Sequence, residues 1–131
     1  MFSRFFPNGN SLQQDTVAAN GVHGALLIGP RHKIGLQVAE WGKVLSAFEI
    51  DLLRDGRIMD RGQSKNVLGG PVSALRHLVE LLAHDEINPP LAAGEVVTTG
   101  TLTRAMPVRS GETWSTALDG ISLAGIQVRF D

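Results

Sequence analysis

Hydrophobic and polar positions along the chain first indicate a β-hairpin between residues 44 and 59. Residues 47–53 and 57–59 are rich in strand-forming side chains, and Asp55-Gly56 lies between them. An Asp-Gly pair supplies the positive backbone φ angles that a two-residue hairpin turn requires. The pattern therefore predicts two antiparallel strands joined by a tight turn.

The clearest helix is predicted to begin at Pro71, because proline fits the first helical position, where no backbone N–H is needed. Apolar residues then recur at spacings of three and four, which places them on one helical face: Val72, Leu75, Leu78, Val79 and Leu82. The Asn-Pro-Pro sequence at 88–90 ends the helical region. We expect the apolar face to belong to the core.

Short apolar runs predict further strands on both sides of this helix. Asn-Gly at 20–21 and Asp-Gly at 119–120 mark turns between them. We expect these strands at residues 25–28, 34–41, 95–98, 113–118 and 121–130. One main helix among many strands favours the α+β class, with a mixed or mostly antiparallel sheet.

Length and composition suit one soluble domain. The chain has 131 residues, of which 43% are hydrophobic and 19% charged, so we expect most of it to be folded. Basic residues form no run and aromatic residues are few, which excludes an obvious nucleic-acid surface. The absence of Cys excludes disulfides, thiolate metal sites and a Cys nucleophile. No apolar run is long enough to span a membrane or to resemble a signal peptide, so we expect a cytoplasmic location and no membrane partner.

The first fourteen residues differ from the rest, because they combine three Phe residues with Pro, Asn and Gly. We expect residues 1–14 to form an arm that is poorly ordered or docks on a partner. The domain itself is expected to occupy residues 15–131.

Four stretches of this domain carry recognisable motifs. They are DTVAANGVHG at 15–24, VLGGPVSAL at 67–75, LAAGEVVTTGTLT at 91–103 and GIQVRF at 125–130. In this order they resemble the 2-keto-4-pentenoate hydratase and 4-oxalocrotonate decarboxylase family of the fumarylacetoacetate hydrolase superfamily. The resemblance implies that superfamily's C-terminal domain: a mixed, mostly antiparallel β roll or open barrel with one main helix. It also implies a homo-oligomer of two or more chains.

Members of this family add water to 2-hydroxydienoates or decarboxylate 4-oxalocrotonate, with Mg²⁺ or Mn²⁺ as cofactor. The resemblance implies a hydratase-like lyase, or a remnant of one, acting on a 2-keto or 2-hydroxydienoic acid. The family's Glu-x-Glu metal ligands and catalytic Lys lie upstream of the stretch that Asp15 begins, and no residue before Asp15 is acidic. We therefore expect no metal to be bound by this chain alone, and we assign no catalytic residue. The alternative is a non-catalytic domain that binds a small carboxylic acid or serves assembly.

The loop at 99–103 is the best candidate for substrate binding, and the resemblance places it at the substrate pocket. Gly100 allows backbone N–H groups to approach an anion, and the hydroxyls of Thr99, Thr101 and Thr103 are donors for a carboxylate. A threonine-rich turn that satisfies its own backbone is the alternative.

Two further groups are candidates for the same pocket. Leu68 and Gly69 precede the helix, whose N-terminus attracts carboxylates, with Lys65 as an additional cation; a plain strand-to-helix connection is the alternative. Asn20 and His23 lie on the first turn and face the pocket by resemblance. A histidine exposed on a surface turn is the simpler interpretation of His23.

Glu49 and Asp51 are weak metal candidates. They are two residues apart on a predicted strand, so their carboxylates share one face and offer oxygen ligands to Mg²⁺. The simpler interpretation is the solvated face of an edge strand, because hard-metal sites need more converging carboxylates.

Overall fold

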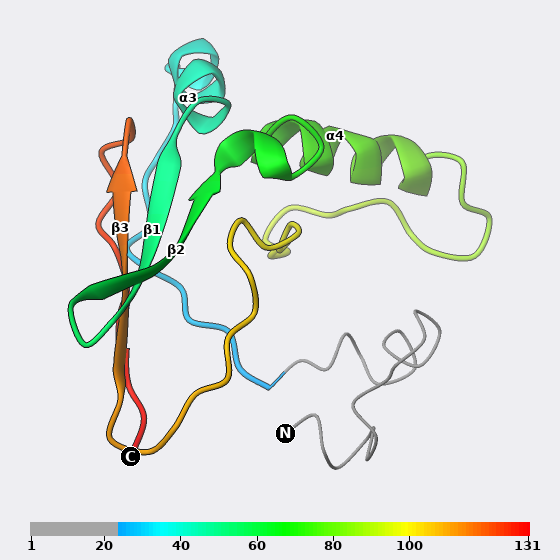
Figure 1. The fold of residues 1–131 in the computed structure, drawn as a ribbon. Coiled ribbons are helices and arrows are strands. Elements are labelled where there is room, and N and C mark those ends of the chain that lie inside the picture. The colour runs from blue at the N-terminus through cyan, green and yellow to red at the C-terminus, as the bar shows by residue number, and fades with distance from the viewer. Residues whose placement is uncertain (1–23) are drawn as a thin grey trace.

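The computed structural model describes residues 24–131 of the chain (Figure 1). Its strands form one antiparallel sheet in the order β2-β1-β3-β4. In chain order the helices and strands are α3 (Val38–Leu45), β1 (Glu49–Arg54), β2 (Arg57–Gln63), a 3-10 turn (Ser64–Asn66), α4 (Pro71–Leu82), β3 (Thr113–Asp119) and β4 (Gln127–Arg129). The predicted α+β class with a mostly antiparallel sheet is confirmed, with two helices in the described residues.

The hairpin of β1 and β2 is confirmed. Arg54 pairs with Arg57, which leaves Asp55 and Gly56 as a two-residue turn with φ angles of 49° and 78°. Both angles are positive, as this type of hairpin turn requires. β3 pairs with the other side of β1 over the whole length of that strand, from Glu49↔Asp119 to Arg54↔Trp114. β1 is therefore the central strand of the sheet.

The helix α4 begins at Pro71 as predicted, but the expected strand at 34–41 is wrong. The chain instead forms α3 from Val38, in which Trp41, Val44 and Leu45 are half-buried. These residues lie three and four positions apart, which is the spacing of one helical face. The short apolar run was therefore a helical signal rather than a strand.

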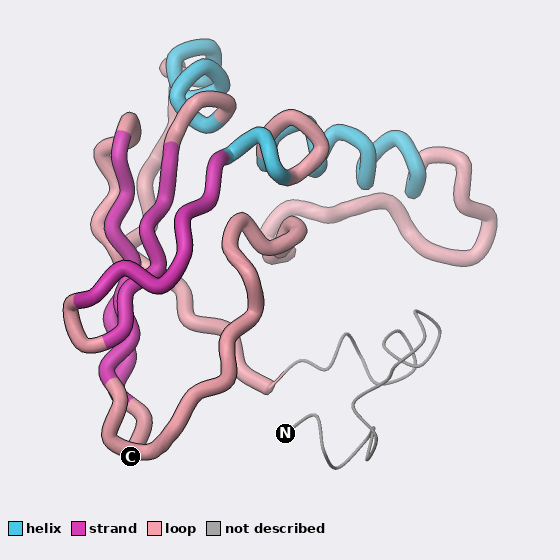
Figure 2. The backbone as a smooth tube through the Cα atoms, in the orientation of Figure 1, coloured by secondary structure: helices cyan, strands magenta, loops and turns pink. Residues whose placement is uncertain are grey.

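Two other predicted strands are absent from the described structure, at residues 25–28 and 95–98. Both stretches have no ladder partner within residues 24–131 and expose their apolar side chains, such as Ile28 and Val96. A strand is defined by its partner, so strand-forming residues alone do not produce one. Of the strand expected at 121–130, only Gln127–Arg129 forms a strand, which is β4. Figure 2 shows how much of the chain between α4 and β3 is loop.

The core of the described part is small, and α4 adds little to it. Buried hydrophobic residues are Phe48, Val67, Trp114 and Ile121. The predicted core face of α4 is only partly covered: Leu78 and Leu82 are half-buried, whereas Val72 and Val79 are 47% exposed and Leu75 is 37% exposed. The prediction is therefore wrong for these last three residues, which no described element buries. Among residues 24–131, no helix is long and apolar enough to cross a membrane.

Candidate functional site

Strand β2 forms one side of the candidate site. Asp60 and Gly62 are two residues apart on β2 and share one of its faces. The loop around Leu102 lies directly over this face: a Cβ added at Gly62 would overlap the carbonyl oxygen of Leu102 and lie 2.7 Å from its carbonyl carbon. Gly62 is buried by this contact. The absence of a side chain at Gly62 is what allows the loop to approach the strand so closely.

The two loops that the sequence nominated for the pocket meet here. The amide Nδ2 of Asn66 donates a hydrogen bond of 3.2 Å to the carbonyl oxygen of Leu102. A Cβ at Gly100 would lie 3.6 Å from Cγ1 of the buried Val67, so this glycine packs against the connection that leads to α4. The residues at 64–67 and at 99–103 are thereby held against each other.

An open cleft of about 390 Å³ lies between these segments. It is lined by Asp60, Arg61, Asn66, Thr101, Leu102, Thr103 and Arg104. Thr101 and Thr103 are the predicted residues that reach it. The hydroxyl of Thr99 instead donates to the carbonyl oxygen of Gly100 at 3.4 Å, as in a self-satisfied turn.

Asp60 and Arg104 form the most extensive polar contact in the cleft. The Asp60 carboxylate accepts hydrogen bonds from the Arg104 main-chain N–H at 2.8 Å, from Nε at 3.2 Å and from Nη2 at 3.5 Å. The main-chain N–H of Arg104, followed by its guanidinium, holds the pKa of Asp60 below the ordinary value of a carboxyl group. Asp60 therefore stays ionised beside a charged guanidinium at neutral pH.

Arg61 also borders the cleft, but its side chain lies on the opposite face of β2 from Asp60 and Gly62, because successive strand residues alternate. There its Nε lies 3.1 Å from Oδ1 of Asp51, its pairing partner on β1. The charged side chains of the cleft are therefore the paired Asp60 and Arg104. The Arg104 guanidinium, the threonine hydroxyls and the amide of Asn66 are donor types that bind a carboxylate.

Leu68 and Gly69 do not line this cleft, although they lie next to it in sequence. Leu68, Gly69 and Gly70 have successive positive φ angles of 47°, 80° and 135°. The N–H of Gly69 donates to the Lys65 carbonyl oxygen at 3.3 Å, and that of Gly70 donates to the Val67 carbonyl oxygen at 2.7 Å. These two N–H groups are satisfied within their own loop, so anion binding at this helix start has fewer donors than the sequence suggests.

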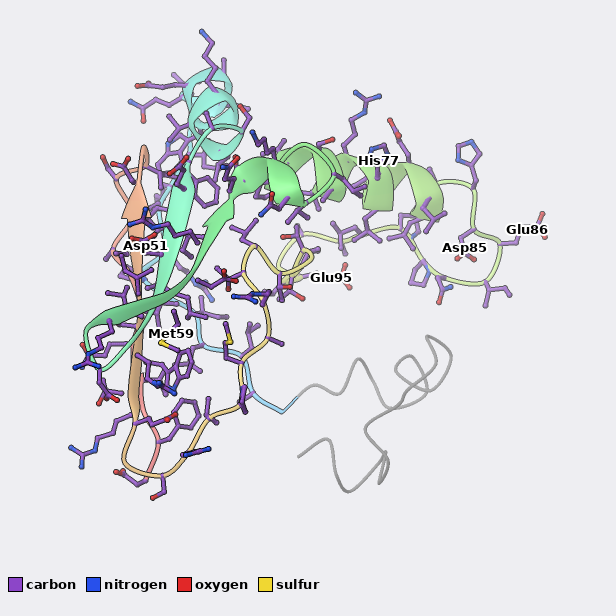
Figure 3. All side chains as sticks on the ribbon, in the orientation of Figure 1. Asp51, Met59, His77, Asp85, Glu86 and Glu95 are labelled. Carbon is purple, nitrogen blue, oxygen red and sulfur yellow. The ribbon has the colours of Figure 1, made fainter. Side chains whose placement is uncertain are left out.

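Glu49 and Asp51 share a face of β1 as predicted, with Asp119 opposite Glu49 and Arg61 opposite Asp51. The Arg61 ion pair occupies one oxygen of Asp51. Figure 3 shows that Asp51 on the sheet, His77 on α4 and Glu95 on the following loop lie far apart. Residues 24–131 contain no group of three or more His, Asp or Glu side chains placed to hold a metal ion.

Asn20, His23 and the arm at 1–14 lie outside the described residues and stay predictions. The residues that the sequence did not nominate are Asp60, Arg61, Asn66 and Arg104. One signal for them was available, since a glycine inside a strand indicates close approach of another backbone segment.

Comparison with known proteins places these observations in a family context. The family model described as fumarylacetoacetate (FAA) hydrolase C-terminal matches residues 3–129. The chain is 31% identical over 107 residues to 2-keto-4-pentenoate hydratase 1 of Dechloromonas aromatica (strain RCB), which covers 82% of this chain and 38% of the relative. It thus spans well under half the length of the curated relatives that it matches.

Solved structures agree with this comparison. The 4-oxalocrotonate decarboxylase from Pseudomonas putida G7, complexed with calcium and acetate, superposes with a TM-score of 0.59 at 30% identity, covering 66% of this chain and 32% of that chain. The decarboxylase complexed with magnesium and adipate gives a TM-score of 0.57 at the same identity and coverage.

Proposed function

We propose that this chain supplies the carboxylate-binding part of a hydratase-like lyase acting on a 2-keto or 2-hydroxydienoic acid. It belongs to the fumarylacetoacetate hydrolase C-terminal family, and the proposal proceeds from that membership. The observation that carries the proposal is the cleft between β2 and the loop at 99–104. Two threonines, the amide of Asn66 and the guanidinium of Arg104 line it. The related decarboxylase holds the carboxylates acetate and adipate, which supports a carboxylate as the ligand class.

The chemistry of the cleft matches the two ends of a 2-keto acid. A guanidinium binds a carboxylate through charge-assisted hydrogen bonds, which are shorter and stronger than neutral ones. The hydroxyls of Thr101 and Thr103 and the amide of Asn66 are donors suited to the adjacent keto or enol oxygen. These groups bind and orient the ligand, and no acid or base for the reaction is assigned among them.

Metal chemistry requires further ligands in this proposal. The related decarboxylase is complexed with calcium or magnesium, whereas residues 24–131 contain no group of three metal-ligating side chains. The missing carboxylates then come from outside the described residues, in this chain or in another. The second candidate function is a domain that binds a small carboxylic acid without turning it over, which requires only the donors that line the cleft.

Assembly into a homo-oligomer is part of the proposal. The apolar face of α4 is exposed at Val72, Leu75 and Val79, and exposed apolar patches mark protein contacts. We expect two or more copies in solution, measured by light scattering coupled to gel filtration. A monomer at about 100 μM protein would overturn this part, because interfaces of standard size have dissociation constants in the micromolar range or tighter.

The test is a calorimetric titration of the chain with oxalate, alone and with Mg²⁺ or Mn²⁺. Metal-dependent binding in the micromolar range, followed by turnover of a 2-hydroxydienoate, supports the lyase. Oxalate binding without metal binding or turnover supports the non-catalytic domain. Failure to bind oxalate under every condition overturns both. If metal binds, Glu49→Gln with Asp51→Asn decides whether these two carboxylates hold it.

A further inference from the structure

Arg104 is attached to Asp60 by one edge of its guanidinium. The Nε and Nη2 atoms face the two carboxylate oxygens at 3.2 Å and 3.5 Å, and the main-chain N–H of Arg104 adds a third bond at 2.8 Å. The partners are 44 residues apart in sequence. Three bonds to one carboxylate fix both the loop and the plane of the guanidinium, because the planar donors of arginine have a rigid geometry.

The other edge of the same guanidinium is free for a ligand. Nη1 and the second N–H of Nη2 have no hydrogen-bond partner among residues 24–131. Asp60 is only 18% exposed in its side chain, whereas Arg104, which lines the cleft, is 75% exposed, so the outer edge of the guanidinium is open to solvent and to a ligand. Two parallel N–H groups on such an edge match the two oxygens of a carboxylate.

The carboxylate beside this edge is already engaged. Arg61 also borders the cleft, but its side chain lies on the opposite face of β2 and pairs with Asp51 there, so Arg104 is the cation of the cleft. Both oxygens of Asp60 already accept bonds from Arg104, so this carboxylate is poorly placed to serve as a metal ligand or a general base. Its remaining role is to hold the guanidinium.

We infer that Arg104 is the residue that selects a free carboxylate in this cleft, through its Nη1–Nη2 edge, and that Asp60 is a positioning residue that orients it. The inference rests on the proposed function, which requires only that the cleft binds a small carboxylic acid. It adds the residue that determines the ligand class. Neutral esters and amides, which lack two equivalent acceptor oxygens, are rejected at this position.

The experiment titrates the full chain with oxalate and follows amide and arginine Nε–H signals by NMR. Four variants are compared with the parent: Arg104→Lys, Asp60→Asn, Asp60→Glu and Arg57→Lys. Arg104→Lys keeps the charge but removes the planar fork. Arg57 is exposed on β2 outside the cleft, which makes Arg57→Lys the matched control.

We expect Arg104→Lys to weaken oxalate binding at least about tenfold, since a bidentate pair is replaced by a point charge. Asp60→Asn should weaken it by about three- to tenfold and shift the Arg104 Nε–H signal, because the charged partner of that edge is lost. Asp60→Glu should recover part of the affinity and of the signal. Arg57→Lys should bind like the parent.

The outcomes separate the two proposals. If the parent chain does not bind oxalate, the proposed function fails and the inference fails with it. If the parent binds and Arg104→Lys binds equally well, the assignment of Arg104 is wrong while the proposed function stands. If Asp60→Asn leaves both the affinity and the Arg104 Nε–H signal unchanged, the positioning role of Asp60 is wrong.

Discussion

Replacing Gly62 by alanine tests whether the cleft depends on the close approach of β2 to the loop around Leu102. The new Cβ would lie 2.7 Å from the Leu102 carbonyl carbon, whereas carbon atoms in contact are separated by about 3.5 Å or more. The loop must therefore move by roughly 0.8 Å. A movement of that size along the contact stretches the hydrogen bond from Asn66 to Leu102, now 3.2 Å, beyond hydrogen-bonding range.

The expected loss of stability follows from these terms. Overpacking costs about 1–3 kcal/mol, and the lost hydrogen bond costs about 1 kcal/mol. Replacing glycine also restricts the unfolded chain, which offsets about 0.4–1 kcal/mol. We expect a net destabilisation of about 2 kcal/mol. With a urea m-value of about 1.5 kcal/mol/M, the unfolding midpoint falls by about 1.3 M at an unchanged m-value.

Gly42→Ala is the matched control for this measurement. Gly42 lies in α3, and a Cβ there would meet no atom within 4 Å. Alanine in a helix is favoured over glycine by about 1 kcal/mol, so this midpoint should rise or stay unchanged. A Gly62→Ala midpoint within about 0.3 M of the parent, at equal m-value, would refute the close approach and the cleft built on it.

Three other measurements probe the same architecture. Because Arg104 lowers the pKa of Asp60, the stabilisation from that charge is fully present above about pH 4 and is lost as the pH falls through the lowered pKa. The urea midpoint of Asp60→Asn should therefore fall less steeply on acidification than that of the parent. Equal pH dependence of the two midpoints would contradict this. Trp114→Phe removes the indole N–H that donates to Glu112 at 3.0 Å, so the pKa of Glu112 should rise in an NMR carboxyl titration, whereas an unchanged pKa argues against the bond. Gly56→Ala places a side chain at a φ of 78° and should destabilise the hairpin by about 1 kcal/mol in urea unfolding, while an unaltered midpoint would contradict that turn geometry.

Local signals explain which elements the sequence could predict. The Asp55-Gly56 turn specifies its hairpin without reference to the rest of the chain, and Pro71 marks the start of α4 in the same way. The strand at 113–118 was also predicted, and it pairs with β1. Each of these elements carries its own turn, start signal or alternation, so tertiary context was not needed to recognise it.

Elements whose signals are ambiguous or depend on a partner were not predicted correctly. A short apolar run such as 34–41 fits a helix or a strand equally well until its neighbours are known. The runs at 25–28 and 95–98 have strand-forming residues but no partner strand in the described part. Strand propensity alone therefore gave a wrong prediction for both runs. Incomplete cover by the described elements likewise leaves Val72, Leu75 and Val79 of the apolar face of α4 exposed.

The candidate site was likewise accessible to the sequence only in part. Thr101 and Thr103 were nominated because they lie in a motif, whereas the Asp60–Arg104 contact joins residues 44 apart that no local pattern connects. Gly62 was the available hint, because a glycine inside a strand indicates that another backbone segment approaches it. Motifs therefore identified the loop, but only the fold showed which strand the loop covers.

The segments that expose apolar surface are distinct from the segments that form the cleft, and this separation has a functional consequence. The segments at 25–28 and 95–98 and part of the α4 face expose apolar side chains, which is typical of protein contact surfaces. The cleft, in contrast, is held by contacts that lie wholly within residues 60–104, at Gly62, Asn66 and Asp60. In the proposed function, carboxylate binding rests on these local contacts, whereas metal-dependent turnover requires ligands beyond those of residues 24–131. Binding and turnover are therefore tested by separate experiments.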